Sequence, residues 1–251
     1  MSRIGGVLAG RNIVPDRVRD RLPAAYAWNA GRVSRFKYYR HSAIYPSQGA
    51  EGRHTRGERS MANVKINATE VSPHKVQRLA ESYYKGGFFC DEAVMCALRD
   101  VFQMEVPVEV ISMVSGMSVG VGKSGCMCGA ANGGVAALGL LYGRTEQNGP
   151  TDPKVVKCMS LTHELHDWFR DANGKHALCC RVLTREFDMG QGEHKEQCIW
   201  FTGLCAWKVA KIVCREEGIK DLDGGTEGGD EPLARQKLED VQPLKKEAFV
   251  A

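Results

Sequence analysis

The sequence lacks an apolar run long enough to cross a membrane. The most apolar stretch, VAALGLLYG at residues 135–143, has only nine residues. A membrane-spanning helix needs about 18 or more apolar residues. The first 60 residues also lack the apolar segment of a secretory signal and a twin-arginine pair. We therefore expect no membrane span and a cytoplasmic location, with a periplasmic location left open.

Two cofactor signatures are also missing. No C-x-x-C-H string occurs, which excludes covalent c-type haem and leaves non-covalent haem open through one of seven histidines. Gly122-Lys123-Ser124 looks like the end of a phosphate-binding loop, but that loop requires a glycine five residues before Gly122, where Met117 stands. A nucleotide-binding function is therefore not favoured.

Cysteine is absent from residues 1–89 and 215–251, so that all ten cysteines lie between these segments. A chain of 251 residues without an export signal does not need disulfides to stabilise its fold. The clustering therefore favours metal ligation or redox thiol chemistry over a disulfide framework.

The positive charge is confined to one segment. Residues 1–60 hold twelve Lys and Arg against four Asp and Glu, although the whole chain has a net charge of only +4. These arginines form no known nucleic-acid-binding motif, so we expect a solvated or subunit-wrapping arm and no nucleic-acid partner. Met61 opens a sequence typical of a protein start, which leaves Met1 and Met61 as alternative starts.

The apolar periodicity is helical along most of residues 61–218. Ser72 and Pro73 are typical of a helix start, and Gly86-Gly87 separates this helix from a second one that begins at Cys90. Further helices are expected from residue 128 to Gly143, from Asp152 to Gly174, and in a long final segment that ends at Gly218. The residues between 107 and 122 predict a short helix or strand that leads into glycines.

This pattern predicts an all-α fold. We expect a compact helical domain, residues 61–218, with a cysteine-lined loop at a helix N-terminus. An extended basic arm, residues 1–60, would precede it, and a polar C-terminal tail, residues 219–251, would follow.

Four cysteines stand in a recurring sequence context. Cys128 opens the string Cys-Gly-Ala-Ala-Asn-Gly, and three further cysteines occur in GGFFCDEAV (Cys90), CCRVL (Cys180) and EQCIWF (Cys198). This combination resembles the redox-active family named for one cysteine, a C-G-A-x-x-G string and two more cysteines. It is also similar to the split-Soret cytochromes c, from which it differs by lacking C-x-x-C-H. The resemblance covers roughly residues 72–214.

The resemblance implies a helical, often dimeric protein whose cysteines bind an iron–sulfur or other iron centre. Its ligands would be Cys90, Cys128, Cys180 and Cys198, and Cys126 and Cys179 are neighbouring candidates. Lys123 would offset the negative charge of such a centre, and backbone N–H groups near Gly129 would tune its reduction potential. We expect an electron-transfer protein that forms a homodimer and works with an unidentified redox partner protein. No catalytic residue or substrate site is evident, and the cluster could be 2Fe-2S or 4Fe-4S.

Two alternatives remain open. Zinc accepts the same thiolate ligands, but structural zinc sites usually draw on closely spaced cysteines, whereas these four span about 108 residues. In that case the protein would be a non-enzymatic interaction subunit. Alternatively, Cys126 with Cys128, or Cys179 with Cys180, could act as a thiol–disulfide pair.

The remaining candidates have ordinary interpretations. Cys96, Cys158, Cys205 and Cys214 are expected in the apolar core. His163 and His166 share one helix face and could hold a metal ion, although exposed histidines at this spacing are more often not ligands.

Overall fold

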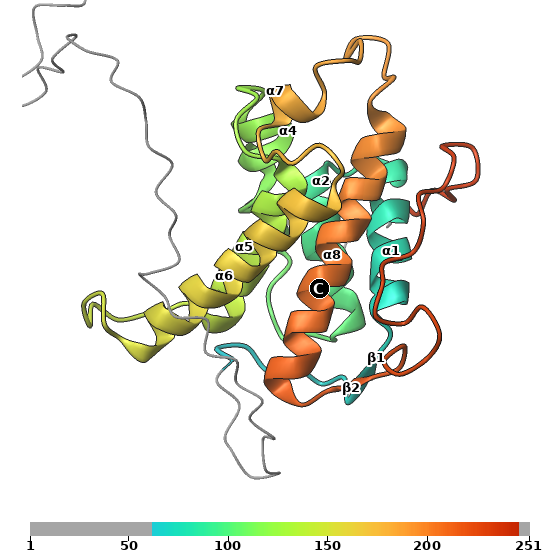
Figure 1. Cartoon of the computed structure of the whole chain (residues 1–251). Coiled ribbons are helices and arrows are strands. Elements are labelled where there is room, and N and C mark those ends of the chain that lie inside the picture. The colour runs from blue at the N-terminus through green and yellow to red at the C-terminus, as the bar shows by residue number, and fades with distance from the viewer. Residues whose placement is uncertain (1–61, 246–251) are drawn as a thin grey trace, which may run out of the picture. The chain divides into compact units, whose positions relative to one another are not determined.

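The structure is a computed structural model, and it describes residues 62–245 (Figure 1). The predicted basic arm, the alternative start at Met61 and the last six residues of the predicted tail therefore lie outside the described residues.

Helices make up most of the regular structure. In chain order the elements are β1 (Glu70–Val71), α1 (Pro73–Gly86), α2 (Cys90–Val101), α3 (Glu109–Ser112), η3 (Ser115–Met117), α4 (Ser118–Val121), α5 (Gly129–Tyr142), α6 (Pro153–Ala172), α7 (Cys180–Leu183), α8 (Lys195–Glu217) and β2 (Lys220–Asp221). The prediction of an all-α fold is confirmed. Among the described residues, none of these helices is both long and apolar enough to span a membrane.

The boundary between α1 and α2 follows the predicted signals. The Ser72 hydroxyl accepts a hydrogen bond from the Lys75 backbone N–H at 3.1 Å, and Pro73 occupies the first turn of α1. Gly87 then adopts φ 128°, which a side chain would disfavour, and the helix ends. Cys90 is therefore the first residue of α2, as predicted.

The later helices also end close to the predicted positions. The Asp152 carboxylate accepts a hydrogen bond from the Lys154 N–H at 2.7 Å and so caps α6. This helix ends at Ala172, with Asn173 as its C-cap, just before the predicted stop at Gly174. Gly218 ends α8 in a left-handed conformation, φ 64°.

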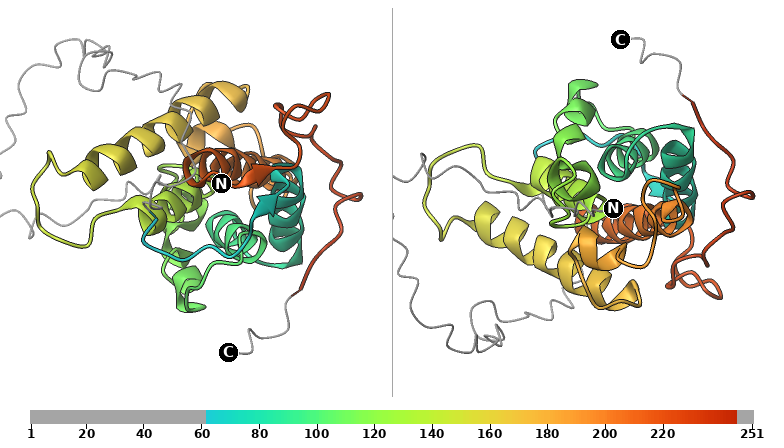
Figure 2. Two further views of the ribbon diagram at one scale, coloured as in Figure 1. Left: turned by 90° about the horizontal axis from the view of Figure 1, so that it is seen from below. Right: turned by 90° about the horizontal axis from the view of Figure 1, so that it is seen from above.

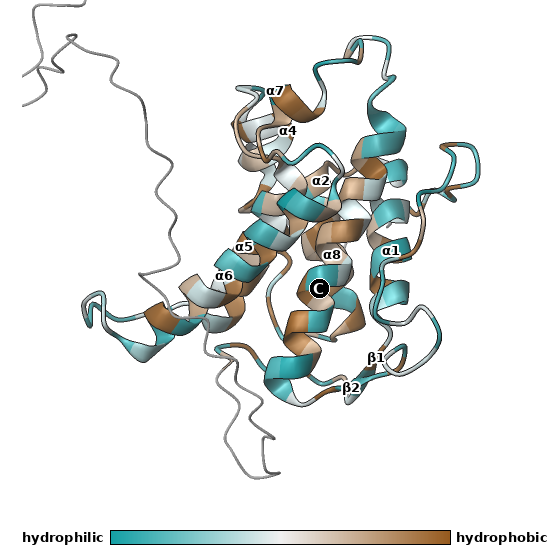
Figure 3. Cartoon of the chain, viewed as in Figure 1, coloured by the Kyte–Doolittle hydropathy of each residue, from teal (hydrophilic) through white to brown (hydrophobic). Residues whose placement is uncertain are grey.

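The core lies between α8 and the helices around it. Helix α8 packs against α1, α2 and α5, and α6 covers α5 and α8 (Figure 1). Phe169 of α6 and Phe201 of α8 are both fully buried and meet edge to face, with ring centroids 5.6 Å apart. Burial of each such side chain stabilises the fold by roughly 1.5–3 kcal/mol. The side of α6 seen in Figure 3 is mainly hydrophilic.

The chain after α8 runs back along α1. Strand β2 pairs in parallel with β1, with Val71 opposite Asp221. Further on, the Leu233 N–H donates to the Gln77 side-chain oxygen at 2.8 Å, and the Leu244 N–H donates to the Ser82 carbonyl at 3.0 Å. These contacts bring the segment after β2 to the helix end that leads into Cys90.

Candidate metal centre

The four cysteines predicted as ligands line one small cavity of about 30 Å³. The full lining comprises Tyr84, Phe89, Cys90, Val119, Cys128, Gly129, Cys180, Met189, His194 and Cys198. Cys90, Cys128 and Cys180 are buried, and Cys198 is half-buried. The structure therefore brings together residues that lie far apart in the sequence. They meet at the end of the helical bundle where α4 and α7 lie, and Figure 2 (right) views the molecule from that end.

Each cysteine lies at or near the start of a helix. Cys90 and Cys180 are the first residues of α2 and α7, Cys128 is the N-cap of α5, and Cys198 lies in the first turn of α8. The N-terminal ends of the long helices α2, α5 and α8 carry partial positive charge and free N–H groups. This environment favours thiolates over thiols once a cation compensates for their burial.

Two glycines of the Cys128 string allow α5 to approach the start of α2. A Cβ atom on Gly129 would lie 2.3 Å from the Cys90 sulfur, and one on Gly133 would lie 2.8 Å from the Asp91 Cα. Both distances are far too short for a side chain. The glycines at these positions therefore let the Cys90 thiol sit directly against the backbone beside Cys128.

The loop before Cys126 has an unusual backbone. Residues 119–123 all have positive φ, between 54° and 71°, which makes a left-handed turn. Each non-glycine residue in this conformation costs roughly 1–2 kcal/mol, and a β-branched one such as Val119 is a genuine outlier. Hydrogen bonds within the loop, such as Cys126 N–H to the Gly120 carbonyl at 3.1 Å, hold this turn. The short helix expected between residues 107 and 122 is present as α3 (Glu109–Ser112), and it is followed by this glycine-containing left-handed turn, whose Val119 lines the cavity.

A short antiparallel contact joins this loop to the segment that carries Cys180. The Cys128 N–H donates to the Leu178 carbonyl at 2.7 Å, and the Arg181 N–H donates to the Gly125 carbonyl at 3.0 Å. The Arg181 side chain also donates to the Ser124 carbonyl. These bonds place Cys180 beside Cys128 without a regular sheet.

Burial and, after it, the charge of a neighbouring cysteine raise the pKa of all four thiols. Burial, followed by the nearby thiol of Cys198, raises the pKa of Cys128 to about 12, although the N–H groups of Ala131 and Ala130 act against this shift. Burial also raises the pKa of Cys90, Cys180 and Cys198. The cavity thus disfavours several uncompensated negative charges, as expected of thiols that ionise only when a cation binds.

Comparison with known proteins gives one family match. Residues 88–212 match the family described as "Putative redox-active protein (C_GCAxxG_C_C)". The chain belongs to this family. No curated protein and no solved structure matches the chain.

The description of the C_GCAxxG_C_C family suggests a redox role for this chain, and cysteines are the signature of the family. Cys90, the string that begins at Cys128, Cys180 and Cys198 occur in the order of the family pattern and inside the matched residues. The family description gives this string as G-C-A-x-x-G and not as the expected C-G-A-x-x-G, and in this chain the order is C-G-A-x-x-G, with the glycine after Cys128. The cavity now gives a spatial reason for the pattern, since its four cysteines are the ones that converge.

Cys126, Cys179 and Lys123, the other candidates for the family's site, lie outside the lining of the cavity. Cys126 and Lys123 are exposed, and Cys179 is half-buried immediately before Cys180. Their roles stay predictions. Of the four predicted core cysteines, Cys96, Cys205 and Cys214 are buried, whereas Cys158 is only half-buried at the edge of the core.

Several residues near the cysteines were missed by sequence reasoning. The Tyr84 side chain lies in the cavity wall, and its pKa is raised by burial and then by all four cysteines. Burial raises the pKa of Cys198, and the positive charges of Arg235 and Lys175 partly oppose this effect. Arg235 reaches this position through an ion pair of 3.0 Å with Glu196 of α8. No local sequence signal links residue 235 to the cysteines, because this link depends on the return of the chain along α1.

His194 is the other missed residue. It precedes α8, lines the cavity, and has a buried Nδ1 atom with no hydrogen-bond partner. Burial, followed by the charge of Lys195, lowers its pKa, which favours the neutral imidazole. The only signal in the sequence is its spacing, since His194 is four residues before Cys198 and thus one helical turn away.

Proposed function

We propose that Cys90, Cys128, Cys180 and Cys198 bind an iron–sulfur cluster and that the protein transfers electrons. The observation that carries this proposal is the convergence of these four cysteines on one cavity. A cluster bound there would take up and release one electron at a time. The family assignment supports a redox role in general, and the cluster is our more specific proposal.

The residues present fit such a group. Four thiols are the usual ligand set of 2Fe-2S and 4Fe-4S clusters. The bare backbone at Gly129, where a Cβ would meet the Cys90 sulfur at 2.3 Å, lets this thiol lie directly beside the start of α5 that carries Cys128. Nearby N–H groups of Ala130 and Ala131 and the positive charges of Arg235 and Lys175 would stabilise the thiolates. Lys123 belongs to the proposal as a further positive charge.

The spacing of the thiols favours a cluster over a single zinc ion. Tetrahedral zinc with Zn–S bonds of about 2.3 Å brings its sulfurs to roughly 3.8 Å from one another. Among the described residues, no three cysteine sulfurs lie within 4.8 Å of one another. A cluster distributes its thiolate ligands over several iron atoms, so it suits ligands that stand farther apart.

The surroundings of the cavity suit electron transfer with a partner protein. Phe89 and Met189 line the cavity and are still 48% and 37% exposed. Val121 of the left-handed turn and Val182 of α7 are also exposed at this end. A partner that covers these apolar side chains would approach the centre closely. We include a homodimer in the proposal, and size-exclusion chromatography with light scattering tests it.

His194 would complete the environment of the centre. A buried nitrogen without a hydrogen-bond partner costs about 1–3 kcal/mol. If the imidazole Nδ1 carries its proton, it can donate to a sulfur atom of the centre and recover this energy. His194 would then position and tune the centre rather than ligate it, because four cysteines already complete the ligand set.

The test is the metal content of anaerobically purified protein. We expect a brown protein that contains iron and acid-labile sulfide in equal amounts. A colourless protein with one zinc ion would favour the zinc-stabilised interaction subunit. A colourless protein without metal, whose Cys126–Cys128 or Cys179–Cys180 thiols oxidise reversibly to a disulfide, would favour the thiol–disulfide alternative.

A further inference from the structure

A second group of metal-ligating side chains lies on helix α6, apart from the cysteine cavity. His163, His166 and Asp167 stand at positions i, i+3 and i+4 of this helix, so they share one face. Leu161, Leu165 and Phe169 face the core, whereas the three polar side chains are 54%, 40% and 42% exposed. Their face is therefore accessible to a small ion.

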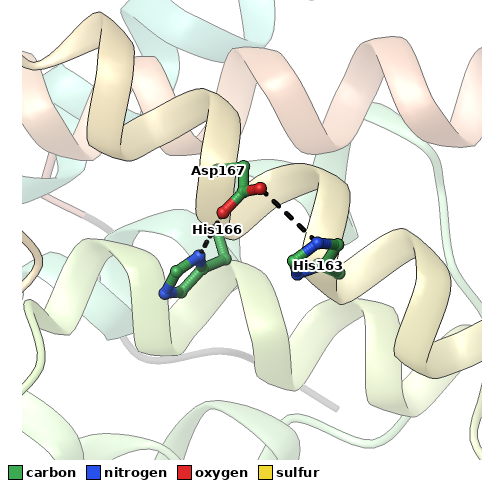
Figure 4. Close-up of side chains that lie close together, drawn as sticks. All are labelled: His163, His166 and Asp167. Atoms are coloured by element: carbon green, nitrogen blue, oxygen red, sulfur yellow. Dashed lines mark hydrogen bonds and ion pairs between the residues drawn. The ribbon is translucent and has the colours of Figure 1, made fainter. Parts of the chain in front are cut away.

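The three ligand atoms already lie close together. The Asp167 carboxylate stands between the two imidazoles (Figure 4), with His166 Nδ1 at 2.8 Å and His163 Nε2 at 3.4 Å. All three ligand atoms are within 4.8 Å of one another, and no other set of His, Cys, Asp and Glu among residues 62–245 meets this criterion. The two imidazole rings are nearly parallel, at 15°. Small side-chain rotations would bring the three atoms to metal–ligand distances, because their exposed side chains are free to adjust.

The Asp167 side chain can serve as a carboxylate ligand at neutral pH, because an aspartate carboxyl group ordinarily ionises near about pH 4. A competing cation is also present, since Arg170 Nη1 lies 3.4 Å from the same carboxylate.

We propose that His163, His166 and Asp167 bind a divalent transition-metal ion on the surface of α6. Two imidazole nitrogens and one carboxylate oxygen form a ligand set that suits Zn²⁺ and its neighbours Co²⁺ and Ni²⁺. The all-oxygen preference of Ca²⁺ and Mg²⁺ makes these ions poor candidates. Three protein ligands leave at least one position for water or for a ligand from another molecule. This site does not depend on the cluster proposed above, because none of its residues lines the cysteine cavity.

Cobalt is the probe of choice because its spectrum distinguishes the two regions of the protein. Co²⁺ bound by thiolates absorbs strongly in the near ultraviolet, whereas Co²⁺ bound by nitrogen and oxygen shows only weak visible bands. Titration of the full-length, anaerobically purified chain with Co²⁺ should give one equivalent of the second type. Zn²⁺ added afterwards should remove this signal.

Variants separate a built site from surface binding. We expect His163→Ala and Asp167→Asn each to weaken Co²⁺ binding at least about tenfold, because each removes one of three ligands. His176→Ala is the matched control, since His176 is 74% exposed and lies outside the trio, and it should bind as the wild type does. Arg170→Gln should bind several-fold more tightly, because a competing positive charge is removed.

Equal Co²⁺ affinity in the wild type, His163→Ala and Asp167→Asn would mean an adventitious ion only and would overturn the proposal. So would a signal of the thiolate type that accounts for all the bound Co²⁺. Circular dichroism of each variant checks that the fold is intact, which we expect because all the substituted side chains are at least partly exposed.

Discussion

Buried cysteines occur in two regions of this helical bundle, and their surroundings differ. At one end, Cys90, Cys128 and Cys180 line a cavity together with the half-buried Cys198. Cys96 and Cys205 are fully buried among apolar side chains and lie outside the cavity lining, although burial and then Cys128 and Cys90 raise the pKa of Cys205. Burial alone therefore does not distinguish a candidate ligand from a core residue. The difference lies in convergence, since only the first group meets around an open space at helix starts.

The largest expected effect comes from serine substitutions in the two regions. Cys90→Ser, Cys128→Ser, Cys180→Ser and Cys198→Ser should each lose most of the iron, because a hydroxyl is a poor substitute for a soft thiolate. Cys96→Ser and Cys214→Ser should keep the iron and lose about 1–3 kcal/mol of unfolding free energy, the cost of a buried polar group. Iron per chain and urea-induced unfolding measure both effects.

Cys126→Ser and Cys179→Ser sharpen this comparison, because these cysteines lie outside the cavity lining. We expect both variants to retain iron. If Cys126→Ser and Cys179→Ser lost iron while Cys128→Ser and Cys180→Ser retained it, then Cys126 and Cys179 would be the ligands in place of Cys128 and Cys180. Small, equal effects in all the serine variants would refute the cluster.

The next effect concerns the contact between α5 and α2. Gly129→Ala places a methyl group 2.3 Å from the Cys90 sulfur, so it should displace this thiol and lower the iron content substantially. Gly139→Ala is the matched control on the same helix, since its Cβ would meet nothing within 4 Å. The control should retain iron and gain about 0.5–1 kcal/mol of stability from reduced backbone freedom. Full iron content in Gly129→Ala would show that this close approach is not needed.

His194 should have a smaller effect that leaves the iron in place. Loss of one hydrogen bond to a sulfur, worth about 1 kcal/mol, corresponds to a shift of roughly 40 mV for a one-electron couple. We expect His194→Ala to lower the reduction potential by this order, and His194→Gln, which retains an N–H donor, to restore part of it. Voltammetry of the wild type and both variants measures the shift. An unchanged reduction potential in His194→Ala would contradict a hydrogen bond from His194 to the centre.

The smallest effect is expected in the α6–α8 contact, away from the cysteines. Burial acts against ionisation of Glu164, but hydrogen bonds from Arg215 and Lys208 lower its pKa from 4.5 to about 2. Its ionised form therefore contributes stability above pH 4.5, and this contribution disappears as the pH falls towards 2. Glu164→Gln should lose about 1 kcal/mol at pH 7, in keeping with a partly exposed ion pair.

The stability difference between Glu164→Gln and the wild type should shrink on acidification, and the iron content at pH 7 should not change. Chemical unfolding at several pH values checks the first expectation. A difference that stays constant down to pH 2 would contradict the assignment of the low pKa to Glu164.

The fold was predictable where local signals decide it. Ser72 with Pro73, Gly87 and Gly218 mark helix ends by backbone chemistry that needs no tertiary contact. The turn at residues 119–123 was not predictable in the same way, because two valines there adopt a conformation that their side chains disfavour. Tertiary contacts hold this turn against the local preference.

The site was predictable to a similar extent. The four cysteines emerged from their sequence context, and Gly129 was singled out for its backbone N–H group. The steric role of Gly129 against Cys90 required the packing of α5 on α2. Likewise, Arg235 acts on Cys198 only because the chain after α8 returns along α1, and His194 became notable only when its Nδ1 was found buried without a partner.

Mössbauer spectroscopy of ⁵⁷Fe-labelled, anaerobically purified protein tests the central claim most directly, because it reports the ligands and the nuclearity of iron in one measurement. We predict the spectrum of a cluster in which every iron site is tetrahedrally bound by sulfur, and its loss in Cys198→Ser. A wild-type spectrum of mononuclear iron alone, or a cluster spectrum that persists unchanged when Cys198 is replaced, would contradict the account.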